Sequence, residues 1–130
     1  MIGLVLVTHA GLAEELLRAA EMIVGAIELT ETVGIRPGDP VDGIRNAIAV
    51  AIGKVDGNGV IIMTDMFGGT PSNISLSFLK ENQIEVLTGV NLPMVIKFAS
   101  DRQSAGVAEL AGRLKVCGQE SISVAGEYLK

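Results

Sequence analysis

Short apolar runs alternate along the chain with longer segments in which apolar residues recur every three or four positions. Such runs are typical of strands buried in a parallel sheet, and the recurring pattern is that of amphipathic helices. We therefore expect strands over residues 2–8, 27–33, 60–64 and 84–89. Helices are expected over residues 12–24, 40–54, 94–98 and 104–116, with a further helix beginning near residue 70.

This alternation predicts an α/β fold with three layers, in which helices cover both faces of a mostly parallel four-stranded sheet. The commonest order for four such strands is 2-1-3-4. No linker or repeat interrupts the pattern, so we expect a single domain over residues 1–130. Residues 121–128 have strand character at Ile122 and Val124, but no local segment offers them a partner.

Two loops carry signals for the start of a helix. Asp39 is placed to be an N-cap with Pro40 in the first helical position, and Thr70 and Pro71 repeat that pattern. Both helices are therefore expected to begin at these residues.

The only histidine, His9, follows the first apolar run, and Asp65 follows the third. In the expected strand order, the first and third strands are neighbours and the topological switch point lies between them. The two side chains should therefore face each other at the carboxyl edge of the sheet, where ligands of open α/β sheets bind.

A carboxylate beside an imidazole fixes the tautomer, because it accepts a hydrogen bond from one ring N–H and leaves the other nitrogen as a nucleophile. It also stabilises the positive ring that forms when that nitrogen is modified. The alternative is that His9 is packed for structure alone and that Asp65 caps a turn.

Gly68 and Gly69 precede Thr70 and Pro71 in the loop after the third run. Two glycines let the backbone approach a ligand closely, and a helix start offers free N–H groups beside the threonine hydroxyl. This combination suits a phosphoryl group or another tetrahedral anion. Taken alone, the two glycines are a weak signal and more often form an ordinary turn.

Composition excludes several classes of protein. A net charge of −5 without a basic stripe argues against nucleic-acid binding. No apolar run approaches the roughly 20 residues of a membrane-spanning helix, and no basic segment of a signal peptide precedes the first strand. The single cysteine, Cys117, rules out an intramolecular disulfide and fits the cytoplasm; we interpret it as a small, inert core residue.

Other catalytic schemes lack their residues. The chain has neither a Gly-Lys-Ser/Thr phosphate loop nor the Gly-x-Gly-x-x-Gly fingerprint, which disfavours a nucleotide as phosphoryl donor. It has no Gly-x-Ser-x-Gly elbow, and one histidine with one cysteine does not make a usual zinc site. We expect no cofactor and no metal. What remains is a domain that carries a phosphoryl group on His9.

Three segments carry a resemblance to a known family. Residues 8–11 (Thr-His-Ala-Gly), 65–73 (Asp-Met-Phe-Gly-Gly-Thr-Pro-Ser-Asn) and 89–94 (Gly-Val-Asn-Leu-Pro-Met) resemble the IIA domain of the mannose/fructose/sorbose family of the bacterial phosphoenolpyruvate:sugar phosphotransferase system (PTS). The resemblance extends over essentially the whole chain. Members often have Trp at the position of Phe67, a change that keeps an apolar rim.

The resemblance implies a phosphoryl carrier. His9 matches the histidine that the phosphocarrier protein HPr phosphorylates and that passes the group to a histidine of a IIB component, which phosphorylates the sugar at a membrane permease. Asp65 matches the partner carboxylate and Thr70 the hydroxyl that contacts phosphate. Family members are homodimers that exchange a C-terminal strand, which would give residues 121–128 a partner.

Two further expectations concern the rest of the chain. Because the sequence stops at Lys130, we expect a IIA protein that is separate from its IIB component. We expect the loop over residues 89–94 to wall the pocket near His9, with Asn91 capping the next helix, Pro93 opening it, and no catalytic role for Asn91.

Two alternatives stay open. A regulatory module of the same fold would use the same His9 site to control a partner without transporting sugar. The second alternative is a non-catalytic interaction domain, but this function would not explain why His9, Asp65 and Thr70 are placed together. The sequence identifies neither the sugar nor the IIB partner.

Overall fold

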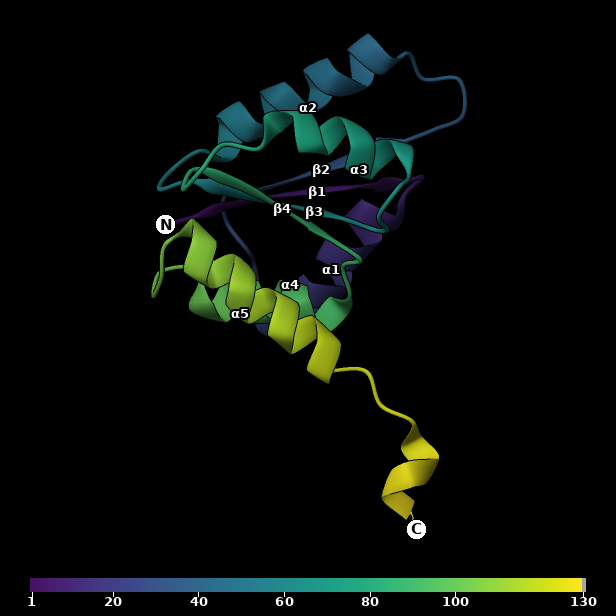
Figure 1. Cartoon of the computed structure of the whole chain (residues 1–130), viewed down its shortest axis with the longest axis vertical. Coiled ribbons are helices and arrows are strands. Elements are labelled where there is room, and N and C mark those ends of the chain that lie inside the picture. Colours follow the sequence, from purple (N-terminus) through teal and green to yellow (C-terminus); the bar gives the residue numbers. More distant parts are fainter. Residues whose placement is uncertain (130) are drawn as a thin grey trace.

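The computed structural model describes residues 1–129 of the chain as a parallel sheet between two layers of helices (Figure 1). The strands are β1 (Gly3–His9), β2 (Thr30–Ile35), β3 (Val60–Thr64) and β4 (Ile84–Thr88). Their order in the sheet is β2-β1-β3-β4, so the predicted α/β class and the 2-1-3-4 order are confirmed.

The helices divide between the two faces of the sheet. The elements are α1 (Leu12–Val24), α2 (Val41–Val55), α3 (Thr70–Ser75) with the 3-10 turn η1 (Leu76–Phe78), α4 (Leu92–Asp101) and α5 (Val107–Glu120). Figure 1 shows α2 and α3 over one face and α1, α4 and α5 over the other.

The two central strands are buried on both faces, which is why their sequences are continuously apolar. Side chains alternate between two cores. Leu4, Leu6, Ile61 and Met63 pack with the α1, α4 and α5 side, and Val5, Val7, Val60 and Ile62 pack with the α2 and α3 side. This double burial fixes the register of β1 and β3, and with it the positions of the residues that follow them.

A buried arginine closes the amino edge of the sheet, opposite the ends of β1 and β3. Arg102 is 6% exposed, and its guanidinium donates hydrogen bonds to the backbone carbonyls of Ile2, Glu28 and Leu29. The same group lies 4.7 Å from the ring centroid of Phe98. It joins the end of α4 to the starts of β1 and β2.

The β2 and α5 boundaries differ from the expected ones. β2 begins at Thr30 and not at residue 27, because Leu29 turns the chain with a φ of +49°. The helix expected from residue 104 begins at Val107, because the Ser104 hydroxyl bonds the carbonyl of Asp101 in the preceding turn.

Two of the predicted helix caps are wrong. The Asp39 carboxylate accepts the backbone N–H of Arg36 at 2.8 Å within its own loop, so Pro40 takes the cap position of α2. Thr70 is the first residue of α3, and Gly69 is its cap. The cap of α4 is as expected: Asn91 accepts the N–H of Met94 at 3.2 Å, with Pro93 in the first turn.

The strand expected over residues 121–128 does not form within this chain. After Ser121 the tail leaves the body of the molecule and ends in the 3-10 helix η2 (Ala125–Leu129) (Figure 1). Its backbone bonds are local, such as the one from Glu127 N–H to the Val124 carbonyl at 3.0 Å. A strand needs an edge to pair with, and the tail has none beside it here. Strand exchange in a homodimer stays a prediction.

Candidate active site

His9 and Asp65 meet at the carboxyl edge of the sheet, as the strand order predicted. The ring Nδ1 of His9 lies 2.8 Å from Oδ2 of Asp65. The same oxygen accepts the backbone N–H of His9 at 3.0 Å. Because β1 pairs directly with β3, with Val7 opposite Thr64, the sheet itself brings the two residues together.

This contact determines which ring nitrogen is available. Asp65 accepts a hydrogen bond, so Nδ1 carries the proton in the neutral ring and Nε2 has the free lone pair. The His9 side chain is 51% exposed, whereas that of Asp65 is 13% exposed. The orienting carboxylate is therefore sheltered, and the ring that it orients is accessible from outside.

Asp65 holds its negative charge firmly. Burial alone would raise the pKa of its carboxyl, but the hydrogen bonds from the ring and the backbone of His9 outweigh burial, and the pKa lies below its usual value of 3.8. The other oxygen, Oδ1, is buried and has no hydrogen-bond partner among residues 1–129. The interactions of this carboxylate are thus concentrated on Oδ2 and directed at His9.

The predicted glycine loop lies against the His9 ring. A Cβ atom built on Gly69 would be 3.0 Å from Cε1 and 3.5 Å from Nε2 of His9. Gly68 turns the chain with a φ of +88°, a region that favours glycine. Thr70 lines the same cavity of about 420 Å³ as His9. The expected neighbours of His9 therefore come from the start of α3.

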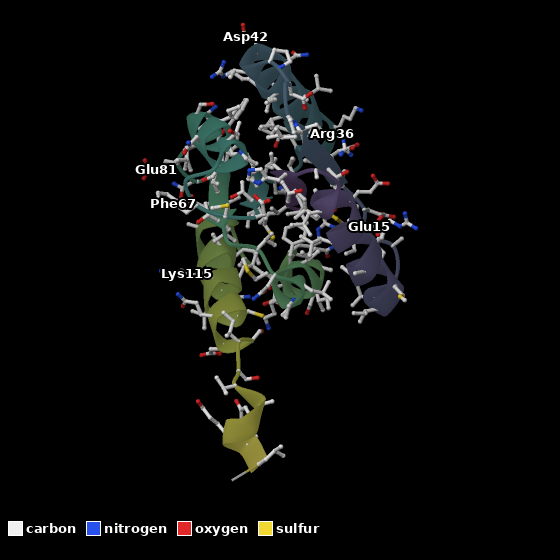
Figure 2. All side chains as sticks on the ribbon, turned by 90° about the vertical axis from the view of Figure 1, so that its right-hand side faces the viewer. Glu15, Arg36, Asp42, Phe67, Glu81 and Lys115 are labelled. Carbon is white, nitrogen blue, oxygen red and sulfur yellow. The ribbon has the colours of Figure 1, made fainter. Side chains whose placement is uncertain are left out.

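Most of the remaining lining of that cavity comes from the loop after β2, and no sequence motif connects this loop with His9. Ala10, Ile35 and the segment over residues 36–39 line it together with Ile44. Figure 2 views the molecule from the right-hand side of Figure 1, with Arg36 and Phe67 on opposite flanks. The register of the sheet explains the arrangement, since His9 pairs with Ile35, the last residue of β2.

The loop over residues 89–94 contributes less than expected. Gly89, Asn91 and Met94 line a different cavity, between β4 and α5, and none of them lines the cavity that contains His9. The side-chain amide of Asn91 donates to the carbonyl of Gly118 at 3.0 Å in addition to capping α4. The predicted wall near His9 is therefore formed by the loop after β2.

Two residues beside His9 were also missed. The Thr8 hydroxyl accepts the N–H of Ala13 at 2.7 Å in the first turn of α1 and donates to the His9 carbonyl at 3.1 Å. Ala10 has a φ of +49°, a left-handed conformation that is strained for alanine. Thr8 before a helix start is a weak sequence signal for such a cap, and nothing in the sequence indicates the conformation of Ala10.

Two general properties complete the description of the site. Among residues 1–129, no three His, Cys, Asp or Glu side chains gather where they could hold a metal ion. In the same part of the chain, no helix combines the length and hydropathy needed to cross a membrane.

Comparison with known families gives a clear match to this arrangement. A model described as "PTS system fructose IIA component" matches residues 3–115, which include β1, the glycine loop and most of α5. The chain belongs to this family. The IIA domain that the three sequence motifs resembled is therefore confirmed, and the chain is a phosphotransfer component of the PTS.

Individual relatives are similar to this chain along nearly its whole length. The fructose-specific EIIA component of Bacillus subtilis is 28% identical over 100% of this chain and 90% of its own length. The sorbose-specific EIIA component of Lacticaseibacillus casei is 30% identical over 90% of this chain and 86% of its own. The crystal structure of an EIIA component from Streptococcus agalactiae superposes with a TM-score of 0.89, at 25% identity, over 98% of this chain and 99% of that one.

Proposed function

We propose that this IIA component accepts a phosphoryl group from phospho-HPr on Nε2 of His9 and passes it to a histidine of a IIB component, which uses it for sugar uptake and phosphorylation. The observation that carries the proposal is the 2.8 Å contact between Asp65 and Nδ1. It leaves Nε2 unprotonated on a side chain that is half exposed.

Neither phosphoryl transfer consumes or releases a proton or a water molecule. The lone pair of Nε2 forms the new N–P bond while the bond from phosphorus to the donor atom breaks, and that electron pair stays on the donor. The ring keeps its proton on Nδ1 and becomes positively charged, and the lowered pKa of Asp65 keeps a negative carboxylate beside it. The onward transfer to the IIB component runs the same bond changes in reverse.

The glycine loop supports the phosphoryl group in this proposal. Gly69 has no side chain beside Nε2, so the space next to the nucleophile stays open. Thr70 lines the cavity with His9 and offers a hydroxyl donor. Gly68, Gly69 and Thr70 are therefore assigned to phosphate binding, and His9 and Asp65 to the transfer itself.

The surroundings of the site suit protein partners. Leu12, Met66 and Phe67 are 46%, 52% and 72% exposed in the segments that follow His9 and Asp65. Exposed apolar side chains beside a reactive histidine are suited to a transient protein interface. HPr and a IIB component would use this surface in turn, since both must reach the same nitrogen.

A homodimer is part of the proposal. The tail exposes Ile122, Val124, Tyr128 and Leu129, which is unfavourable for an isolated chain. β4 is an edge strand, and no other strand within residues 1–129 pairs with its outer side. Pairing of the tail of one protomer with the sheet of another would cover both features.

The test uses the one histidine of the chain. Incubation with radiolabelled phosphoenolpyruvate, Enzyme I and HPr should add one acid-labile phosphoryl group per chain, and His9→Ala should take up none. Adding a IIB component should discharge the labelled protein. A His9→Ala protein that still takes up label would exclude the proposed acceptor.

A regulatory module of the same fold is the second candidate, because it needs the same His9 site. Adjacent IIB, IIC and IID genes, with loss of sugar uptake when this gene is deleted, would favour transport. Unchanged uptake together with a phosphorylation-dependent protein partner would favour regulation.

A further inference from the structure

The loop after β2 brings a positive charge to the edge of the His9 cavity. Arg36 follows Ile35, the strand residue that pairs with His9, and it lines the cavity with His9 and Thr70. Among residues 1–129 it is the only lysine or arginine that lines this cavity.

The backbone of this loop is fixed, so the charge is held near the site. Asp39 accepts the Arg36 N–H at 2.8 Å, and the Asp39 N–H bonds the Arg36 carbonyl at 3.1 Å. On the other side, the N–H of Ala10 bonds the carbonyl of Ile35 at 2.8 Å. The backbone of Arg36 is therefore held by Asp39 within its own loop, and the preceding residue, Ile35, is bonded to the residue after His9.

Arg36 differs from the other arginines of the chain. Within residues 1–129, Arg18, Arg45 and Arg113 form ion pairs with carboxylates, and Arg102 binds backbone carbonyls. The guanidinium of Arg36 has no hydrogen bond and no ion pair in that part of the chain, although all five of its N–H groups are donors.

We propose that the Arg36 guanidinium binds the oxygens of the phosphoryl group carried on His9. This inference rests on the proposed function. A phosphoryl group brings about two negative charges to a cavity that already contains the Asp39 carboxylate and lies beside Asp65. A guanidinium matches phosphoryl oxygens with two parallel N–H donors and offsets that repulsion.

The alternative role for Arg36 is to contact an acidic patch on the donor protein and not the phosphoryl group. The two roles differ in what they change. Contact with the phosphoryl group favours its dianion and lowers the pKa of the group itself, whether or not a partner protein is present. Contact with the donor alters only the transfer rate.

The experiment therefore loads the group without a donor protein. Phosphoramidate phosphorylates histidine chemically, and this chain has a single histidine. The phosphohistidine signal of the wild type, Arg36→Met and Arg36→Lys is titrated by ³¹P NMR. Arg45→Met is the matched control, because it removes the same charge from an exposed arginine outside the cavity.

The phosphoryl pKa should rise by about 0.3 to 0.7 pH unit in Arg36→Met, as expected for a partly exposed charge pair. Arg36→Lys should restore part of the difference, Arg45→Met should match the wild type, and 1 M salt should reduce the effect. Transfer from phospho-HPr should slow about 3- to 10-fold in Arg36→Met.

Two results would overturn the inference. The first is an unchanged titration in Arg36→Met; if transfer from phospho-HPr is slower in that variant all the same, Arg36 belongs to the donor interface. Wild-type protein that takes label from neither phosphoramidate nor phospho-HPr overturns both this inference and the proposed function. Label from phosphoramidate alone overturns the proposed function, and the titration still decides the contact of Arg36.

Discussion

The His9 ring packs against the bare backbone of Gly69. A Cβ atom at Gly69 would lie 3.0 Å from Cε1 of His9, closer than side chains normally tolerate. The φ of Gly69 is −86°, so the backbone itself would accept any residue. The glycine is required by the approach of the imidazole and not by the turn.

Gly69→Ala should therefore affect transfer more than stability. The half-exposed ring can move away by a few tenths of an ångström, which costs little folding free energy but shifts it relative to Asp65. We expect phosphorylation by phospho-HPr to slow roughly 10- to 100-fold. Gly106→Ala is the matched control: Gly106 also caps a helix with extended backbone angles, and an added Cβ there meets nothing within 4 Å. Equal transfer rates in the two variants would contradict the packing argument.

Asp65→Asn should slow transfer much more than it unfolds the protein. The amide keeps the size of the carboxylate but can donate to Nδ1, which favours the tautomer with the proton on Nε2, and it no longer stabilises a positive ring. By analogy with the aspartate of serine-protease triads, the rate should fall on the order of 10²–10⁴. Rapid-quench kinetics with phospho-HPr measure this, with the exposed Asp42→Asn as control. An unchanged rate would remove the orienting role of Asp65.

The lowered pKa of Asp65 also makes stability depend on pH. Because the carboxyl binds its proton more weakly in the folded than in the unfolded protein, it stabilises the fold above its usual pKa of 3.8. That contribution is lost as the pH falls through the lower, folded pKa. Urea unfolding of the wild type and Asp65→Asn between pH 7 and pH 2 should give free energies that converge towards the acid end. A constant difference over this range would show that the carboxylate charge does not stabilise the fold.

Arg102 should be important for stability but not for transfer. Its removal leaves the Ile2 carbonyl without a donor and takes one of the donors from the carbonyls of Glu28 and Leu29, at the edge of the sheet opposite His9. Arg102→Met should lower the free energy of unfolding by about 2–4 kcal/mol. Arg113→Met, at a side chain that is 38% exposed, should change it by less than about 1 kcal/mol. Equal losses in urea unfolding would argue against the buried contacts, as would a transfer defect in folded Arg102→Met.

The sequence predicted the centre of the site because one rule decides it. Parallel strands end at the same edge of a sheet, so the residues after β1 and β3, His9 and Asp65, had to be neighbours once the 2-1-3-4 order was assumed. The glycine loop followed from the same rule. These positions depend on topology and not on the conformation of any long side chain.

Contacts that depend on distant backbone atoms were not predictable in this way. Arg102 binds a carbonyl 100 residues away in the sequence, and no periodicity indicates such a pair. The position of Arg36 beside His9 was not predictable either, because it depends on where β2 ends and how Asp39 folds the loop. The strand pattern of the tail indicates no partner within one chain, so its pairing in a homodimer stays a prediction.

Replacing alanine by glycine should have opposite effects on the stability of the protein at Ala10 and at Ala49. Its φ of +49° costs an L-residue roughly 1–2 kcal/mol, whereas glycine adopts this region freely. The gain is reduced by the greater freedom of glycine in the unfolded chain, so Ala10→Gly should stabilise the protein by up to about 1 kcal/mol. Ala49→Gly, at an exposed position inside α2, should destabilise it by about 1 kcal/mol.

Thermal and urea unfolding of both variants measure the difference. If Ala10→Gly were as destabilising as Ala49→Gly, the left-handed turn after His9 would not be strained. Transfer kinetics add a second readout, because Ala10 is bonded to Ile35 and leads directly from His9 into α1. A more stable Ala10→Gly protein with slower transfer would mean that the strained turn helps to hold the imidazole in place, since relaxing it would then cost precision at the nucleophile.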